Sequence, residues 1–133
     1  MTNLEIINAA LRLLGVIAET EDVSAEQGAT GLAVMNDMLE DWSGRGIDVG
    51  QWPQTALDAE FPGATNIEGV CKANLAVWLA PYYAAPLRPE VAGLAGAGYS
   101  RLLREAMLAQ LQPASMTHLH PGEGQWETEA ITE

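Results

Sequence analysis

The chain has 133 residues, a formal net charge of −12 and an apolar fraction of 48%, which together favour one acidic globular domain over a disordered chain. The acid excess argues against a protein that grips nucleic acid or an anionic membrane over its whole surface, because phosphate contacts are made mainly by Lys and Arg. A single cysteine, no apolar run near the roughly 18 residues of a membrane span, and a start without the basic segment of a signal peptide predict a soluble intracellular protein.

The charge is unevenly distributed along the chain. Residues 1–68 hold 12 acidic and two basic residues, and residues 69–112 hold two acidic and four basic residues. Residues 113–133 hold four acidic residues and no base. Solubility is the simplest interpretation of each charge, and contact between unlike surfaces is the alternative.

A first helix is predicted from Thr2 to Leu14. Thr2 and Glu5 have the spacing of a capping box, in which each side chain accepts a hydrogen bond from the backbone N–H of the other residue. Apolar residues then follow on most sides of the helix, which indicates burial on more than one side. Gly15 suits the left-handed conformation that ends many helices.

A second helix is predicted from Ser24 to Gly44, because Ser24 and Gln27 repeat the capping-box spacing. Its apolar seam consists of Gly28, Leu32, Met35, Leu39 and Trp42. Gly28 and Gly31 each weaken a helix by about 1 kcal/mol relative to Ala. Close approach of a neighbouring helix is the expected compensation.

Residues 47–62 are predicted to form two short strands in a β-hairpin-like arm. Ile47 and Val49 alternate with polar residues, Trp52-Pro53 interrupts the pattern, and the alternation resumes before the turn signal Pro62-Gly63. An isolated hairpin is marginal in water. We therefore expect this arm to lean on the helices or on a neighbouring subunit.

Two further helices complete a mainly α, four-helix domain over residues 1–112. The third begins at a capping-box pair, Thr65 and Glu68, and its stripe is Ile67, Val70, Cys71, Leu75 and Trp78. The fourth begins at Arg88-Pro89-Glu90, is predicted to end at Pro113, and has an apolar face of Val91, Leu94, Ala95, Gly98, Leu102 and Ala106. Residues 113–133 have no helical period and are predicted to be an extended C-terminal tail.

Two patterns suggest chemistry, and each has a simpler structural interpretation. His118 and His120 could share a face of an extended segment, but no fixed further ligands accompany them, as a structural metal site requires. Glu40 and Asp41 are adjacent on a helix and point about 100° apart. We therefore predict solvated residues in both places.

Cys71 and the glycines of GLAGAG (93–98) are also predicted to be structural. Cys71 lies on an apolar stripe, which favours a buried small side chain over a nucleophile. The glycines lie where helical periodicity continues, with no strand before them and no Lys-Ser/Thr after them. Close helix packing explains them better than a phosphate-binding loop.

The four tryptophans divide between predicted core and predicted contact positions. Trp42 and Trp78 lie on apolar helical stripes and are predicted to be core, whereas Trp52 lies in the arm and Trp126 in the tail. An aromatic side chain in a polar tail suits the surface of a partner. Docking of Trp126 on its own domain is an equal alternative.

The order of these segments resembles the head-to-tail connector proteins of tailed bacteriophages, in particular their tail accessory factor (packaged DNA stabilization protein). The resemblance covers residues 4–108. Its most specific pieces are the helix end at residues 10–16, the segment at residues 39–42 followed by Gly46-Ile47, and the segment LAVWLAP at residues 75–81. All three pieces are structural, and none is a catalytic signature.

The resemblance implies a structural subunit, without enzymatic activity or cofactor, that forms a ring of commonly twelve copies beneath the phage portal protein. Such a ring extends the channel toward the downstream tail proteins and helps to retain packaged double-stranded DNA, which passes without specific binding. It acts in the neck of the virion and, during assembly, in the host cytoplasm, with no membrane partner. In such proteins the C-terminal segment binds the portal, and residues 113–133 hold that position here.

Two sets of residues become candidate sites under this resemblance. Carboxylates facing a DNA channel or its rim would repel phosphates, and the candidates are Asp37, Glu40, Asp41 and Asp48. The candidates for subunit and portal contacts are Trp52, Lys72, Arg88, Arg101, Arg104, Met116, Leu119, Trp126 and Ile131.

Two other functions stay open on the residues alone. One is a small helical interaction or morphogenesis module that is not a ring subunit. The other is a hydrolase that uses carboxylates such as Glu40 or Glu68, which requires two acids that converge across one cleft.

Overall fold

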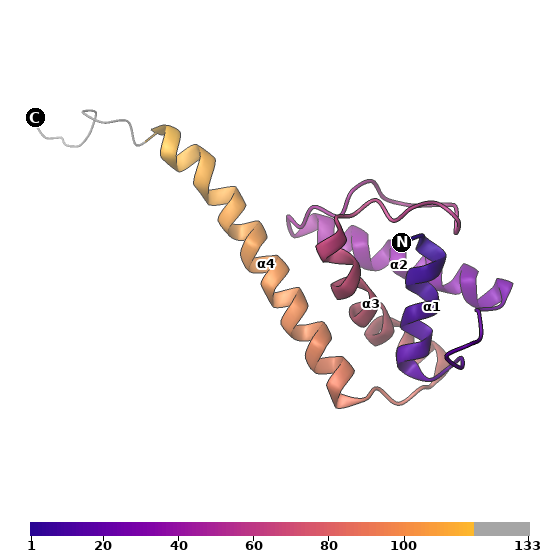
Figure 1. Ribbon diagram of the computed structural model, residues 1–133. Coiled ribbons are helices and arrows are strands. Elements are labelled where there is room, and N and C mark those ends of the chain that lie inside the picture. Colours follow the sequence, from indigo (N-terminus) through magenta and orange to yellow (C-terminus); the bar gives the residue numbers. More distant parts are fainter. Residues whose placement is uncertain (119–133) are drawn as a thin grey trace, which may run out of the picture. The chain divides into compact units, whose positions relative to one another are not determined.

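The computed structural model describes residues 1–118, and the side chains of residues 1–111. The elements are α1 (Asn3–Leu14), α2 (Ala25–Gly44), α3 (Thr65–Leu79), a short 3-10 helix η1 (Ala80–Tyr83) and α4 (Pro89–His118) (Figure 1). Residues 1–118 contain no β-strand, so the prediction of a mainly α fold is confirmed. Among the helices described, none is long and apolar enough to cross a membrane.

The chain forms two compact units, and the first is Met1–Leu103. The second begins at Arg104 and includes the C-terminal part of α4. The predicted helix end at Pro113 is wrong, because α4 continues to His118. A proline lacks one backbone donor and disturbs the preceding turn, but it does not prevent a helix from continuing beyond it.

The first two helices begin and end as their capping residues predict. In α1, Thr2 Oγ1 accepts from the Glu5 N–H at 3.2 Å and the Glu5 carboxylate accepts from the Thr2 N–H at 2.8 Å. Ser24 and Gln27 make the same reciprocal pair at 3.1 and 2.9 Å at the start of α2. Gly15 ends α1 with φ +74°, in the left-handed region that a glycine adopts without strain.

The predicted capping box of the third helix is wrong. The N-cap of α3 is Ala64, which has no side-chain acceptor, and Thr65 is the first residue inside the helix. The Glu68 carboxylate instead accepts a hydrogen bond from the Met1 ammonium at 2.9 Å. Glu68 therefore ties α3 to the start of α1 rather than closing the end of its own helix.

The core lies where α1, α2 and α3 pack against one another. Its largest fully buried side chains include Ile6, Ile7 and Leu11 of α1, Met35, Met38, Leu39 and Trp42 of α2, and Leu75 and Leu79 of α3. The prediction that Trp42 and Cys71 are buried is confirmed. α1 contributes buried residues on several of its sides, as predicted from the apolar residues on most sides of this helix.

Gly31 of α2 leaves room for the side chain of Ile7 of α1. A Cβ at this position would lie 2.5 Å from Ile7 Cγ2, so the predicted close contact with a neighbouring helix is confirmed there. Gly28 is different, because its Cβ would meet Leu57 Cδ1, at 3.1 Å, in the loop that follows α2. That glycine makes room for the loop rather than for a helix.

The predicted β-hairpin arm is wrong, because residues 47–62 form an irregular loop with one isolated antiparallel bridge, between Thr2 and Glu60. The loop carbonyls face the start of α1, where Asn3 and Leu4 N–H groups donate to Ala59 and Leu57 at 2.9 and 2.8 Å. The first N–H groups of α1 have no acceptor within the helix, so they donate to the loop carbonyls that a second strand would otherwise have paired with. The apolar alternation is real, since Ile47 and Val49 are buried, but they enter the helical core.

The part of α4 that lies in the first unit packs on α3 and on α2. A Cβ on Gly98 would lie 2.8 Å from Val70 Cγ2, and the buried Asn74 amide donates to the carbonyls of Val70 and Ala95 at 2.9 and 3.0 Å. The Tyr99 ring lies 5.5 Å from the ring of Trp42. Predicted helix packing at GLAGAG is therefore confirmed at Gly98 only.

Two residues predicted on buried faces are exposed. The exposed fraction of Trp78 is 37% and that of Leu94 is 66%. Both lie at the edges of stripes whose central residues, such as Leu75 and Ala95, are buried. Because a helical stripe is wider than the contact that covers it, periodicity alone does not distinguish an edge residue from a central one.

Candidate functional site

The described surface carries the four acids predicted to face a channel, and all four are exposed. Asp37, Glu40 and Asp41 lie on α2 at spacings of three and four, which places them on one face of that helix. Asp48 lies on the loop after α2, where its carboxylate accepts from the Gly50 N–H at 3.2 Å. The structure thus brings three of the four together on one helix.

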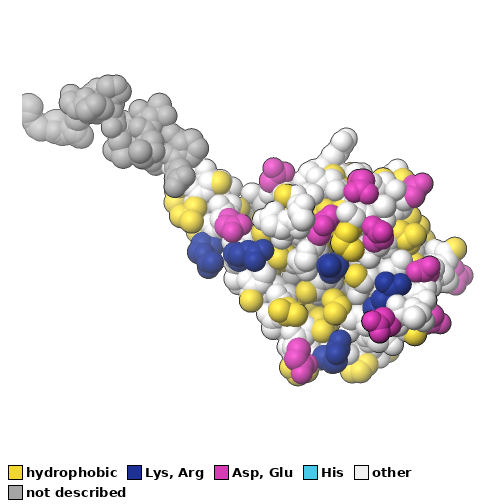
Figure 2. Space-filling model, in the orientation of Figure 1, with side chains coloured by type: hydrophobic (Ala, Val, Ile, Leu, Met, Phe, Trp, Pro, Cys, Tyr) yellow, Lys and Arg dark blue, Asp and Glu magenta, His cyan; other side chains and the backbone are white. Residues whose placement is uncertain are grey.

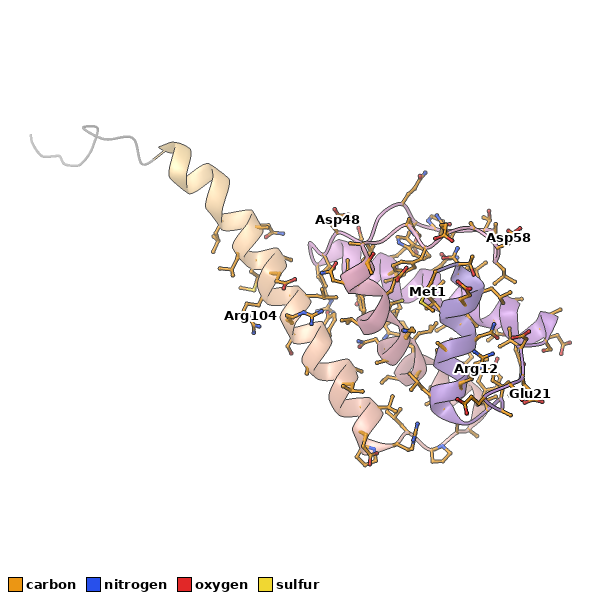
Figure 3. All side chains as sticks on the ribbon, viewed as in Figure 1. Met1, Arg12, Glu21, Asp48, Asp58 and Arg104 are labelled. Carbon is orange, nitrogen blue, oxygen red and sulfur yellow. The ribbon has the colours of Figure 1, made fainter. Side chains whose placement is uncertain are left out.

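The charge environment of these acids differs from one to the next. Asp41 pairs with Arg45 one turn later, at 3.2 Å, which is the geometry of an exposed helix ion pair. Within the described part of the chain, Asp37 and Glu40 have no ion-pair partner. Arg12 pairs with Asp22 at 3.2 Å and also donates to the Glu21 carbonyl at 2.7 Å, so both bases of residues 1–68 are engaged (Figure 3).

Acidic side chains are scattered over the face seen in Figure 2 rather than gathered in one dense patch. In Figure 3, Asp48 and Asp58 lie toward opposite ends of the loop that follows α2. The negative charge of the first unit is therefore spread over α2, over the loop after it and over the loop before it. This spread suits general repulsion of phosphates better than capture of one cation.

The residues predicted for subunit or portal contacts occupy varied places. Trp52 is half-buried, its indole N–H donates to the Val49 carbonyl at 2.6 Å, and its ring lies 5.7 Å from that of Phe61. Lys72 is half-buried on α3, and the exposed Arg88 donates to the Leu13 carbonyl at 2.9 Å. Two more of the predicted residues, Arg101 and Arg104, are exposed on α4.

The remaining predicted contact residues fall at the end of the chain. Met116 lies within α4, but the description of side chains stops at residue 111. Leu119, Trp126 and Ile131 lie outside the described residues, as do His120 and most of the predicted tail.

Exposed apolar side chains are the feature that the sequence pattern did not predict. In the first unit these are Trp78, Tyr82 and Leu94, together with Met1, and in the second they are Met107, Leu108 and Leu111. The only signal in the sequence was that the apolar residues of α4 extend beyond one stripe. Exposed aromatic and large aliphatic side chains that lie close together mark contact surfaces more often than solvent-facing ones.

Two findings concern metal ligands and the reactivity of Cys71. Among the side chains that the structure describes, those of residues 1–111, no group of three His, Cys, Asp or Glu could hold a metal ion. Burial raises the pKa of the Cys71 thiol far above its ordinary value, with a smaller contribution from the Glu68 carboxylate, so this thiol stays protonated. A protonated, fully buried thiol is a poor nucleophile.

Two comparisons with known proteins found no relative of this chain. No protein-family model matches the chain, and no curated protein matches it either.

Proposed function

We propose that this protein is a structural head-to-tail adaptor subunit of a tailed phage, one that forms a ring under the portal and helps to retain packaged DNA. The observation that carries the proposal is the contrast between a filled helical core and large apolar side chains left in solvent. Leu94, Met107, Leu108 and Leu111 are each more than half exposed. A subunit whose surface is completed by neighbours leaves side chains of this kind uncovered.

The exposed carboxylates support the same proposal. Asp37, Glu40, Asp41 and Asp48 are all exposed, and α2 carries no basic residue between Ala25 and Gly44. DNA that must move past a protein surface needs repulsion rather than adhesion, and carboxylates repel phosphates at short range. In a ring, each copy would add its own acids to this lining.

The resemblance of residues 4–108 to phage connector proteins selects this function among the assembly roles that such surfaces allow. A helical module that does not form a ring would share the exposed apolar residues but would have no reason to bind a portal. The discriminating experiment therefore uses the portal ring encoded in the same genome.

The test mixes the full chain with assembled portal rings and follows co-sedimentation. We expect the chain to sediment with the portal in a fixed stoichiometry, and a chain truncated after His118 shows whether residues 119–133 carry part of that contact. A full-length chain that never sediments with portal rings would overturn the proposal. If the truncated chain binds as well as the full chain, only the predicted portal role of residues 119–133 fails.

A further inference from the structure

The segment of α4 that begins the second unit has an uncovered apolar face. Met107, Leu108 and Leu111 have exposed fractions of 61%, 52% and 61%. With Arg104 they lie at positions i, i+3, i+4 and i+7, which is one side of a helix over about 10 Å of its length. Single exposed apolar residues are ordinary, but three within five residues on one helix side make a continuous apolar strip of the kind found at contact surfaces.

On α2, three residues have the same spacing as Arg104, Leu108 and Leu111, but they run toward the N-terminus instead of the C-terminus. Moving along α4 from Arg104 toward the C-terminus, the next residues on this side are Leu108, four positions on, and Leu111, three positions further. Starting from the exposed Asp37 and moving toward the N-terminus, α2 presents the exposed Ala33 and the half-buried Thr30 at the same steps.

Two antiparallel helices in this register would place unlike groups opposite each other. Arg104 would lie opposite Asp37, and Leu108 and Leu111 would lie over the small side chains of Ala33 and Thr30. Small residues on one helix let a second helix approach closely, while the larger side chains of the second fill the space between them. The unpaired charge of Asp37 is the complement that Arg104 requires.

We propose that the Arg104–Leu111 segment of one copy docks antiparallel on the α2 face of a second copy of the chain. The two surfaces differ, so the contact is head-to-tail, and repetition of it gives either a closed ring or an open chain. The proposal rests on the proposed function in one respect, because it names the subunit contact of the adaptor ring. It needs neither portal nor DNA, so its failure and that of the adaptor function can be told apart.

This contact also revises one of the predicted channel residues. Asp37 cannot face a DNA channel while it lies under the α4 segment of a neighbour. Glu40 and Asp41, one turn beyond Asp37 toward the end of α2, and Asp48, on the following loop, keep that prediction.

Charge reversal in separate chains tests the contact. Arg104→Asp places like charges opposite Asp37, and Asp37→Arg places like charges opposite Arg104, so each variant alone should associate at least about tenfold more weakly than the wild type. In a mixture of the two variants, the aspartate introduced at position 104 of one chain lies opposite the arginine introduced at position 37 of the other. Where the two chains exchange roles, the native Arg104 lies opposite the native Asp37. Sedimentation velocity should then show association restored in the mixture. Gln110→Glu and Ser43→Arg, which change charge at exposed positions off the two faces, are the matched controls.

Cross-linking keeps the test decisive if association is weak. Leu108→Cys in one chain and Ala33→Cys in another should form a mixed disulfide under mild oxidation, whereas Gln110→Cys with Ser43→Cys should not. Cys71 is buried and does not interfere. The proposal is overturned if the wild type stays monomeric at its highest soluble concentration and no mixed disulfide forms. It is also overturned if the single reversals associate like the wild type, or if mixing them restores nothing. Unchanged circular dichroism of each variant shows that folding is retained.

Discussion

Asn36 and Gln54 are joined by two hydrogen bonds between a side-chain amide and a backbone amide. Asn36 Nδ2 donates to the Gln54 carbonyl at 2.9 Å, and the Gln54 N–H donates to Asn36 Oδ1 at 2.8 Å. The side chain thus pairs with the loop as a neighbouring strand would, and it holds residues 45–64 against α2. Gln54 also places its own side chain near Asn3, whose amide donates to Gln54 Oε1 at 3.3 Å.

Replacement of Asn36 should release this loop. In Asn36→Ala the part-buried carbonyl and N–H of Gln54 both lose their hydrogen-bond partner. The free energy of unfolding should therefore fall by about 1–3 kcal/mol. Chemical denaturation measures the change. Asn66→Ala, at an exposed position of α3, is the matched control and should stay within about 0.5 kcal/mol of the wild type. Equal effects of the two substitutions would contradict the role given to Asn36.

Gly31 and Gly96 make a second matched pair, because both lie inside helices but only one faces a neighbour. A Cβ on Gly31 would lie 2.5 Å from Ile7 Cγ2, whereas a Cβ on Gly96 meets nothing within 4 Å. Gly31→Ala should therefore lower the free energy of unfolding by about 1–3 kcal/mol through overpacking. Gly96→Ala should raise it by roughly 0.5–1 kcal/mol through helix propensity. Thermal and urea denaturation of both variants give the signs, and the same sign for both would refute the predicted packing at Gly31.

The Cys71 thiol should make stability fall at alkaline pH. Burial raises the pKa of this thiol above its ordinary value of 9.0. Above about pH 9 the unfolded chain therefore loses the thiol proton while the folded chain keeps it. The unfolded state then binds fewer protons, so the free energy of unfolding falls as pH rises, by up to about 1.4 kcal/mol per pH unit.

The measurement compares the pH dependence of stability in the wild type and in Cys71→Ala between pH 8 and pH 11. Near pH 8 the variant should be less stable than the wild type because of the smaller side chain, and above about pH 9 its decline should be shallower, so the two curves should converge. Parallel curves would mean that the thiol titrates alike in both states. Slow modification of the native protein by a thiol reagent, with fast modification in denaturant, is the independent check.

Much of the fold follows from the sequence because local signals and core contacts agree. The capping pairs at Thr2 and Ser24, the left-handed Gly15 and the apolar seams of α1 and α2 predicted these helices correctly. The loop was predicted wrongly for a physical reason. Its apolar alternation is that of a strand, but its hydrogen-bond partners are the first N–H groups of α1 and the side chain of Asn36.

The exposed surfaces could be predicted less well from the sequence than the helices. Exposure of Trp78, Leu94 and Leu108 depends on how much of a helix its neighbours cover, which periodicity does not encode. The acids of α2 could be placed on one face from their spacing alone, because helix geometry fixes that relation. Whether such a face meets DNA, a second copy or solvent is decided by the assembly.

DNA retention in packaged phage heads tests the proposed adaptor function most directly. Heads filled with DNA and lacking this protein are incubated with or without the purified chain, and the DNA that stays protected from nuclease is measured. We expect added chain to raise the protected fraction in proportion to the copies bound at the portal. Equal loss of DNA with and without the chain, under conditions where the chain binds the portal, would contradict the proposed function.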